Sequence, residues 1–219
     1  MTTYRTHIQQ RRYQDKLFVL ETIRDLDEAI DQLCAELGED GEKDPFAEDL
    51  CPYFGILWPA AEGLAQFLSE RPELVKGKSV LELGSGLGLP SLVAHHLGAK
   101  VLTTDFHPEV ESYFHRNCRH SNFDNIAYRR FNWRDSAEDI GQFDVVMGSD
   151  ILYESKHPQE VAQGLVRFLR PGGCILLADQ GRNYLPTFLE AIKREGLSYL
   201  KEIEIVQGKE IQIFSMMAE

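Results

Sequence analysis

The chain has 219 residues, of which 43% are hydrophobic and 26% are charged, and its formal net charge is −12. This length predicts one globular α/β domain with a full core. No apolar run approaches the ~18 residues of a transmembrane helix. The four cysteines are scattered and form no CxxC pair, which argues against a zinc site or a disulfide framework and favours a reducing cytoplasm. The acidic balance disfavours nucleic acid as a partner.

Residues 1–45 are expected to form an N-terminal extension. Residues 4–25 indicate a short strand or hairpin, and helical spacing of apolar residues predicts an amphipathic helix over 26–37, followed by an acidic loop. Residues 21–50 hold twelve acids and two bases, which is −10 of the net −12. Two interpretations stay open: a solvated surface that only aids solubility, or a surface that attracts a basic protein.

Residues 46–219 are expected to form the main domain, in which strands and helices alternate. The predicted strands are 80–83, 100–105, 126–131, 143–149, 174–178, 199–206 and 210–216. The predicted helices begin near Pro59, Pro90, His107, Pro158 and Tyr184. The last two strands read as a hairpin around Gln207-Gly208-Lys209, and a terminal hairpin is not typical of a Rossmann dehydrogenase.

The most informative segment is the strand-and-turn sequence 80–88, with glycine at 84, 86 and 88. Glycine has no Cβ, so the backbone can pass close to a bulky ligand. Leu89 stands where a dinucleotide fingerprint needs its third glycine. Asp105 ends the next strand, 23 residues after Glu82, where an acid can accept hydrogen bonds from ribose hydroxyls. The pattern favours an adenosine-type ligand over a ligand-free turn.

Three further motifs follow the same order along the chain. They are Trp58-Pro59-Ala60-Ala61, Asn132-Trp133 and Asp150-Ile151-Leu152-Tyr153. With the acidic-x-Gly-x-Gly-x-Gly turn, they resemble the family-16 group of class I methyltransferases, whose characterised members are mainly protein lysine N-methyltransferases. The resemblance covers roughly residues 46–217. It implies an α/β, Rossmann-like sheet of order 3-2-1-4-5-7-6 with strand 7 antiparallel and helices on both faces. The implied cofactor is S-adenosyl-L-methionine (SAM), and the product is S-adenosyl-L-homocysteine.

The resemblance also implies which residues bind the cofactor. They are Trp58, Glu82, Gly84, Ser85, Gly86, Asp105, Phe106, Asn132, Trp133 and Ser149. Glu82 would meet the amino group of the methionine moiety, and Asp105 would hold the ribose. Phe106 would pack on the adenine, and Asn132 lies where adenine contacts are expected. Structural roles stay open: Glu82 as a cap of the next helix, and the two tryptophans as hydrophobic anchors.

Asp150 and Tyr153 are the expected catalytic residues. A lysine ammonium has a pKa near 10.4 and no lone pair, so it must lose a proton before it can attack a methyl group. Asp150 can attract and orient that ammonium, and Tyr153 can make one hydrogen bond while its ring walls the channel. No metal is expected, although Asp150, Asp179 and Asn183 could imitate the triad of catechol-type O-methyltransferases.

The sequence therefore predicts a cytoplasmic, monomeric, SAM-dependent N-methyltransferase that acts on a lysine of a basic protein. Neither a nucleic acid nor a membrane is expected as a partner. A small-molecule amine or amide N-methyltransferase remains an alternative. So does a catalytically silent SAM-binding scaffold, which would tolerate loss of Asp150.

Overall fold

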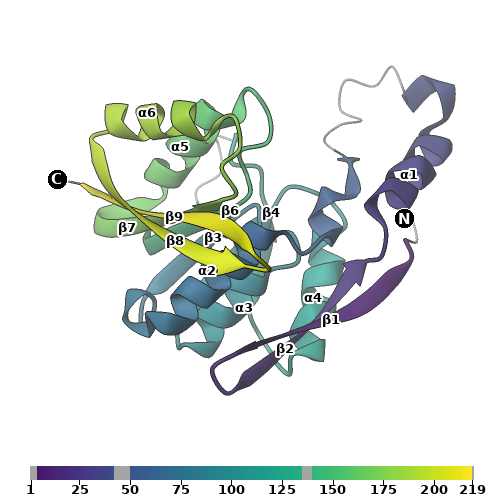
Figure 1. The fold of residues 1–219 in the computed structure, drawn as a ribbon, viewed down its shortest axis with the longest axis horizontal. Coiled ribbons are helices and arrows are strands. Elements are labelled where there is room, and N and C mark those ends of the chain that lie inside the picture. The colour runs from purple at the N-terminus through teal and green to yellow at the C-terminus, as the bar shows by residue number, and fades with distance from the viewer. Residues whose placement is uncertain (1–3, 42–49, 135–139, 219) are drawn as a thin grey trace.

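The computed structural model describes residues 4–41, 50–134 and 140–218, with only the backbone described for 37–41. A seven-stranded sheet runs through the molecule in the order β5-β4-β3-β6-β7-β9-β8 (Figure 1). Its strands are β3 (Ser79–Leu83), β4 (Lys100–Asp105), β5 (Ala127–Arg130), β6 (Phe143–Ser149), β7 (Leu169–Asp179), β8 (Leu197–Val206) and β9 (Lys209–Ala218). Counted within the sheet, this order is 3-2-1-4-5-7-6, and β9 runs antiparallel to both neighbours. The predicted topology is confirmed.

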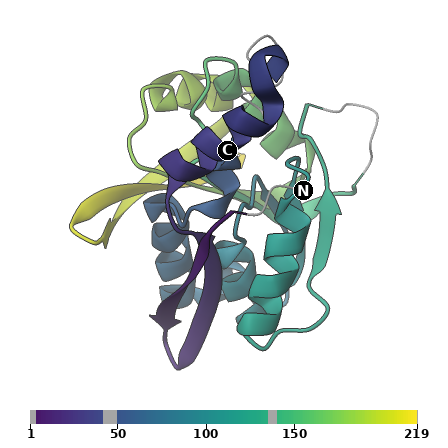
Figure 2. The same cartoon turned by 90° about the vertical axis from the view of Figure 1, so that its right-hand side faces the viewer.

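Helices cover both faces of the sheet, as predicted (Figure 2). One face carries α2 (Pro59–Glu70), α3 (Leu89–His96) and α4 (Val110–His120); the other carries α5 (His157–Arg167) and α6 (Leu185–Arg194). Two apolar cores result, one on each side of β3 and β6. Those central strands are buried on both faces, which is why their sequences are almost continuously apolar. Proline lies in the first turn of α2, α3, α5 and α6, where its missing N–H costs nothing.

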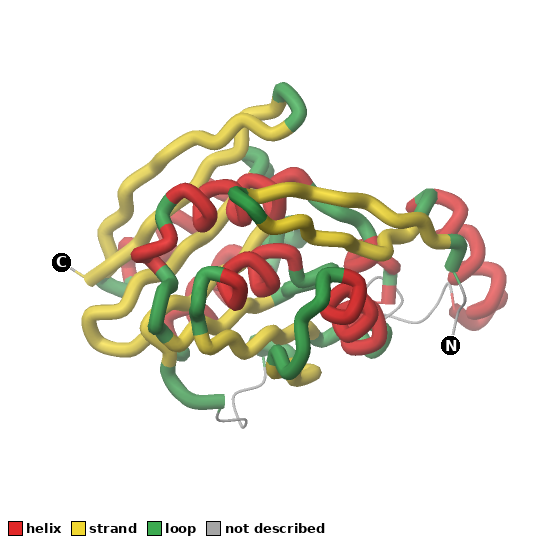
Figure 3. The backbone as a smooth tube through the Cα atoms, turned by 90° about the horizontal axis from the view of Figure 1, so that it is seen from below, coloured by secondary structure: helices red, strands yellow, loops and turns green. Residues whose placement is uncertain are grey.

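The N-terminal hairpin packs onto the sheet's helical layer. Strands β1 (Thr6–Tyr13) and β2 (Lys16–Ile23) pair along their full length, and α1 (Leu26–Gly41) follows (Figure 3). Phe18 and Leu20 of β2 are fully buried in the same core as α2 and α3. Glu21 N–H donates to Asn117 Oδ1 of α4 at 2.7 Å. The hairpin is thus joined to the main domain by shared core packing as well as by hydrogen bonds.

The strands differ from their predicted bounds at one informative place. β7 begins at Leu169, so Pro171-Gly172-Gly173 lies inside the strand and not before it. The pairing with β6 shifts here, because Phe143 pairs with Leu169 while Val145 already pairs with Cys174. Extra residues on one strand form a bulge, and proline and glycine are tolerated at bulges. The breaker residues therefore mark an irregular strand and not its boundary.

The C-terminal hairpin is closed by a two-residue turn at Gln207-Gly208, with φ of 51° and 79°. Positive φ at both positions is typical of the type I′ turn, which suits twisted strands. α1 extends past the predicted end at residue 37, whereas Pro52–Gly55 forms a short 3-10 helix, η2, within a stretch expected to be irregular. No helix in the described ranges is long and apolar enough to cross a bilayer.

Candidate active site

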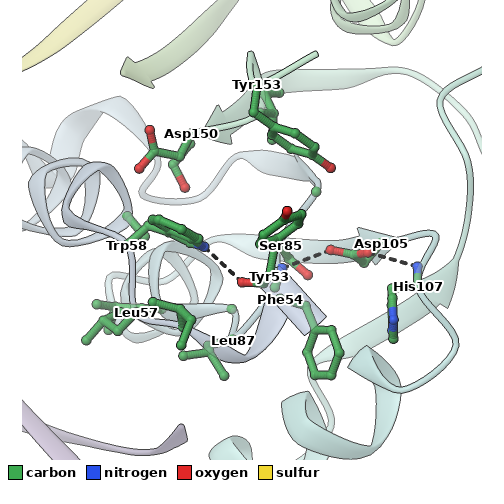
Figure 4. A pocket seen from close by; sticks show the side chains of 18 of the residues that line it. Tyr53, Phe54, Leu57, Trp58, Ser85, Leu87, Asp105, His107, Asp150 and Tyr153 are labelled. Atoms are coloured by element: carbon green, nitrogen blue, oxygen red, sulfur yellow. Dashed lines mark hydrogen bonds between the residues drawn. The ribbon is translucent and has the colours of Figure 1, made fainter. Parts of the chain in front are cut away.

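A cavity lies at the carboxyl ends of β3, β4 and β6, and its volume of about 740 Å³ includes space open to solvent (Figure 4). In open α/β sheets this edge is where ligands bind. The glycine loop after β3 forms its floor, and residues around η2 lie across from it. The lining residues are Cys51, Tyr53, Phe54, Ile56, Leu57, Trp58, Ala61, Gly84, Ser85, Gly86, Leu87, Gly88, Leu89, Asp105, Phe106, His107, Trp133, Ser149, Asp150, Ile151 and Tyr153.

The glycine loop needs its glycines for backbone shape and for packing. Gly84, Gly86 and Gly88 have φ of 64°, 50° and 79°, a region that side chains disfavour. A Cβ on Gly86 would stand 3.0 Å from the Phe54 carbonyl oxygen, and one on Gly88 would overlap the Phe114 ring. The close approaches are therefore to protein atoms, and they bring the loop against η2 and α4. This leaves the loop amides at the cavity wall.

Asp105 joins the glycine loop to the end of β4. Its Oδ2 accepts from Gly86 N–H at 2.9 Å, and its Oδ1 accepts from His107 N–H at 3.0 Å. Burial raises the pKa of this carboxyl, while the backbone hydrogen bonds oppose the rise. Each carboxylate oxygen has a second lone pair. The side chain is thus fixed in place and retains acceptor capacity at the cavity.

Glu82 lies outside the cavity lining. It is fully buried, and its Oε2 accepts from both the backbone N–H and the hydroxyl of Ser91 in the first turn of α3. Burial raises its pKa to about 8. Its Oε1 is buried without a hydrogen-bond partner in the described part of the chain. The contacts present are those of a helix cap, so its expected contact with the cofactor stays a prediction.

The other expected cofactor residues divide into two groups. Trp58, Ser85, Phe106, Trp133 and Ser149 line the cavity. Asn132 does not; its Oδ1 accepts from Arg134 N–H at 3.0 Å. Trp58 Nε1–H donates to the Tyr53 carbonyl at 2.9 Å, so Trp58 is fastened to η2.

Asp150 and Tyr153 mark the border between this cavity and a second one, whose volume of about 860 Å³ also includes space open to solvent. Both residues line both cavities, together with Tyr53 and Trp58, and the second cavity adds Glu154 and Arg182. Asp150 is buried and has φ of 56°, an uncommon conformation for a residue other than glycine. Such strain often marks functional positions. Both cavities therefore reach the same two residues, Asp150 and Tyr153.

Two residues that sequence reasoning did not place in the site hold the Asp150 carboxylate. Arg182 Nε–H donates to Oδ1 at 3.0 Å, and Gln180 Nε2–H donates to Oδ2 at 2.6 Å. Both come from the turn after β7. Asp179 shapes this turn, because its Oδ1 accepts from the backbone N–H groups of Gly181 and Arg182, each at 2.7 Å. From the sequence, Asp179 is considered only as a member of a metal triad with Asp150 and Asn183, and Arg182 has no expected role.

The aromatic wall of the first cavity was also missed. Tyr53 and Phe54 come from η2, and His107 follows β4; the Phe54 and His107 rings lie 4.3 Å apart. The sequence offers two weak signals: the aromatic pair Tyr53-Phe54 before Trp58, and the position of His107 two residues after Asp105. Neither has a spacing that points to a ligand.

Comparison with known proteins places this site in a family. The profile of a lysine methyltransferase family matches residues 51–195, which include the glycine loop, Asp105 and the Asp150–Tyr153 motif. The chain belongs to that family. The matched range includes every lining residue of both cavities, and the turn after β7 that carries Arg182 also lies within it.

Individual relatives of this family member are moderately similar. The electron transfer flavoprotein beta subunit lysine methyltransferase of Xenopus laevis is 30% identical over 133 residues, covering 60% of this chain and 53% of that protein. The histone-arginine methyltransferase METTL23 of the same species is 32% identical over 124 residues, covering 54% and 53%. The chain spans about half the length of these curated relatives. Their names differ in the methylated side chain.

A solved structure supports the fold. The 16S rRNA methyltransferase RsmC of T. thermophilus, in complex with AdoMet and guanosine, matches with a TM-score of 0.67. The match covers 98% of this chain and 51% of that chain, at 17% identity. At this identity the likeness shows a shared methyltransferase fold, whereas the acceptor is not indicated.

Proposed function

We propose that this family member is a SAM-dependent N-methyltransferase that acts on a lysine side chain of a protein. One observation carries the proposal: a cavity at the glycine loop shares Asp150 and Tyr153 with a second cavity. A methyl donor and an acceptor could thus meet from two sides. Membership of a lysine methyltransferase family supports lysine as the acceptor.

The first cavity fits the cofactor chemically. Ser85 Oγ and Trp133 Nε1 are buried without a hydrogen-bond partner among the described residues, and both residues line the cavity. Buried polar atoms of this kind are costly unless a ligand or water satisfies them. Asp105 would hold the ribose hydroxyls, and Phe54, Leu57 and Phe106 would contact apolar parts. When bound, SAM supplies an electrophilic methyl group on a sulfonium sulfur.

The chain's own residues would handle the acceptor. A lysine ammonium entering the second cavity is attracted by the Asp150 carboxylate, which has two fixed oxygens and remaining lone pairs. Tyr153, with its ring 4.5 Å from that of His157, walls the channel. The ammonium then gives its proton to water, and Asp150 and Tyr153 would hold the neutral nitrogen where the two cavities meet. Orientation of this kind lowers a barrier by several kcal/mol or more.

The test is a reaction of the protein with tritiated SAM and cell lysate, separated into protein and small-molecule fractions. Label in protein, released as methylated lysine after hydrolysis, is the expected result. Label in small molecules alone would favour a small-molecule amine acceptor, and methylated arginine would favour the chemistry in the name of the METTL23 relative. Binding of SAM with no transfer to any fraction would indicate a silent scaffold.

Asp150→Asn tests the proposed role of Asp150, because it keeps the side-chain size and removes the charge. We expect its single-turnover transfer at saturating SAM to fall at least about tenfold, or about 1.4 kcal/mol in barrier height. Its SAM affinity should stay close to that of the unaltered protein. Tyr153→Phe should cost less, since only one hydrogen bond is lost. A variant at Asp150 that cannot bind SAM would move this residue to the cofactor side.

The partner is proposed to be a basic protein met in the cytoplasm by a monomeric enzyme, and not a nucleic acid. The acidic segment 21–50 supports this, although its side chains at 37–49 lie outside the described residues. Some of its acids have structural partners: Glu21 pairs with Arg116 at 2.7 Å, and Glu28 pairs with Arg5 at 3.3 Å.

If the segment steers a substrate, turnover should fall with salt, because the Debye length is about 8 Å at physiological ionic strength. The same loss should follow neutralisation of Glu39, Asp40, Glu42 and Asp44. Neutralising Glu190 on α6, an exposed acid outside the segment, is the control. Turnover that ignores both salt and the four changes would make the segment a solubility device.

A further inference from the structure

The carboxylate expected to attract the acceptor already has a cation beside it. Arg182 Nε lies 3.0 Å from Asp150 Oδ1, and both side chains line the second cavity. Arg182 is fixed from three sides: its backbone N–H is held by Asp179, its Nε–H by Asp150, and its guanidinium carbon lies 5.5 Å from the centre of the Trp58 ring. A guanidinium stays protonated at all accessible pH values. This positive charge is therefore a permanent part of the cavity.

The charge of an isolated carboxylate would create a chemical difficulty. A carboxylate close to an ammonium stabilises the charged form and raises the pKa of the amine. The acceptor would then bind well but keep its proton, and a protonated amine has no lone pair for the methyl group. A fixed cation close to the same carboxylate offsets this effect, because like charge favours the neutral amine.

We propose that Arg182 balances the charge of Asp150, so that the acceptor amine is oriented by the carboxylate and still releases its proton. This inference rests on the proposed N-methyltransferase function. The step is an acid dissociation: the N–H bond of the ammonium breaks, its electron pair stays on nitrogen, and water takes the proton. Gln180, which donates to the other oxygen of Asp150, fixes the carboxylate without adding charge.

The remaining charged and titratable groups near the cavity do not replace Arg182. They are Tyr53 from η2, Tyr153 and Glu154 after β6, His157 at the start of α5, Arg134 beside Glu154, and Asp179 at the end of β7. Burial lowers the pKa of His157, which favours its neutral form. Glu154 lies 3.4 Å from Arg134, so its charge is partly balanced by that guanidinium. Of the described residues that line this cavity, only Arg182 is a permanent cation.

The closing experiment compares Arg182→Gln, Arg182→Lys and the unaltered protein. Arg194→Gln serves as the matched control, because Arg194 is an exposed residue of α6. The first readout is single-turnover transfer of tritiated methyl into the labelled lysate fraction from neutral to alkaline pH. A cation at this distance shifts a neighbouring pKa by about one unit or more, so Arg182→Gln should lose about tenfold in rate at neutral pH. The loss should shrink as the pH rises, and Arg182→Lys should restore most of the rate.

The second readout uses n-butylamine as a probe of the cavity, titrated by NMR at neutral pH where it is protonated. Arg182→Gln should bind this ammonium about tenfold more tightly than the unaltered protein, since affinity and proton release are linked. A structural defect predicts the opposite, weaker binding with a loss of rate that is equal at every pH, and that result would overturn the proposal. If no fraction accepts label from the unaltered protein, the proposed function fails, whereas tighter butylamine binding would still show the charge balance at Asp150.

Discussion

At the scale of single residues, Asp105 links the glycine loop to the cavity. Its two oxygens accept backbone N–H groups from Gly86 and His107, so the side chain has one orientation. This geometry means that the residue both shapes the loop and retains lone pairs for a ligand. A variant at Asp105 must therefore be compared with one that disturbs a similar structural hydrogen bond elsewhere.

We expect Asp105→Ala to weaken SAM binding at least tenfold, because one hydrogen bond to a charged group contributes about 1.5–3 kcal/mol. Isothermal titration calorimetry measures the change. Asp144→Ala is the matched control: Asp144 accepts from Ser79 N–H at 2.8 Å at the opposite, amino edge of the sheet. It should lower stability and leave SAM affinity intact. Equal affinities for Asp105→Ala and the unaltered protein would remove Asp105 from the cofactor site.

The sequence was a good guide to residues whose position follows from strand order. Gly84, Asp105 and Asp150 lie at the carboxyl ends of strands that are side by side, so their meeting at one edge was predictable. Arg182 was not, because its direction depends on a turn shaped by Asp179. Glu82 shows the reverse case: its motif position suggests a ligand, yet a serine of the following helix takes up one of its oxygens.

At the scale of elements, the glycine loop combines unusual backbone angles with close packing. Gly88 and Gly77 have φ of 79° and 75°, but only Gly88 has neighbours within reach of an added Cβ. The backbone cost of alanine should be similar at both positions, about 1 kcal/mol. The difference between the two variants then isolates the contact of the loop with Phe114 on α4.

We expect Gly88→Ala to lower the free energy of unfolding by about 1–3 kcal/mol more than Gly77→Ala, the usual range for overpacking. Urea denaturation of both variants measures the difference. SAM affinity should also fall for Gly88→Ala alone, since a displaced loop changes the cavity wall. Equal destabilisation by the two variants would show that α4 yields to the extra methyl group.

Some helices and strands could be predicted from the sequence, and others could not. Proline in the first turn marks the helix starts. Almost continuous apolar sequences mark β3 and β6, because burial on both faces requires apolar side chains. The bulge in β7 could not be predicted, since Pro171-Gly172-Gly173 fits a loop equally well and only pairing with β6 decides. The docking of β2 on α4 also depends on contacts between residues about 100 positions apart.

At the scale of the whole molecule, buried ionisable groups tie stability to pH in opposite directions. Burial raises the pKa of Glu82 to about 8, so its contribution to stability is present below its unfolded pKa of 4.5 and is lost as the pH rises toward 8. His107 acts in the acidic range. The two pH windows overlap between 4.5 and 6.5, but each contribution can be removed by its own substitution.

Burial lowers the pKa of His107 from 6.5 to about 4. Its ring nitrogens show why the neutral form is required: Nδ1 accepts from Glu109 N–H at 3.2 Å, and Nε2–H donates to the Leu50 carbonyl at 3.1 Å. Protonation would place a second N–H against the Glu109 donor. The unfolded chain takes up this proton first, so stability falls as the pH drops from 6.5 toward 4.

We expect the unaltered protein to lose up to about 3 kcal/mol more than His107→Gln across this acidic window, because each unit of pKa difference corresponds to about 1.4 kcal/mol. Urea denaturation of both proteins at several pH values gives the two slopes, and the difference cancels the contributions of Glu82 and the other carboxyls. An NMR titration of the His107 ring should show no protonation until the pH approaches 4. Parallel stability curves for the two proteins would mean that the His107 pocket admits enough water to solvate the charge, and that the contact between η2 and the end of β4 opens in acid.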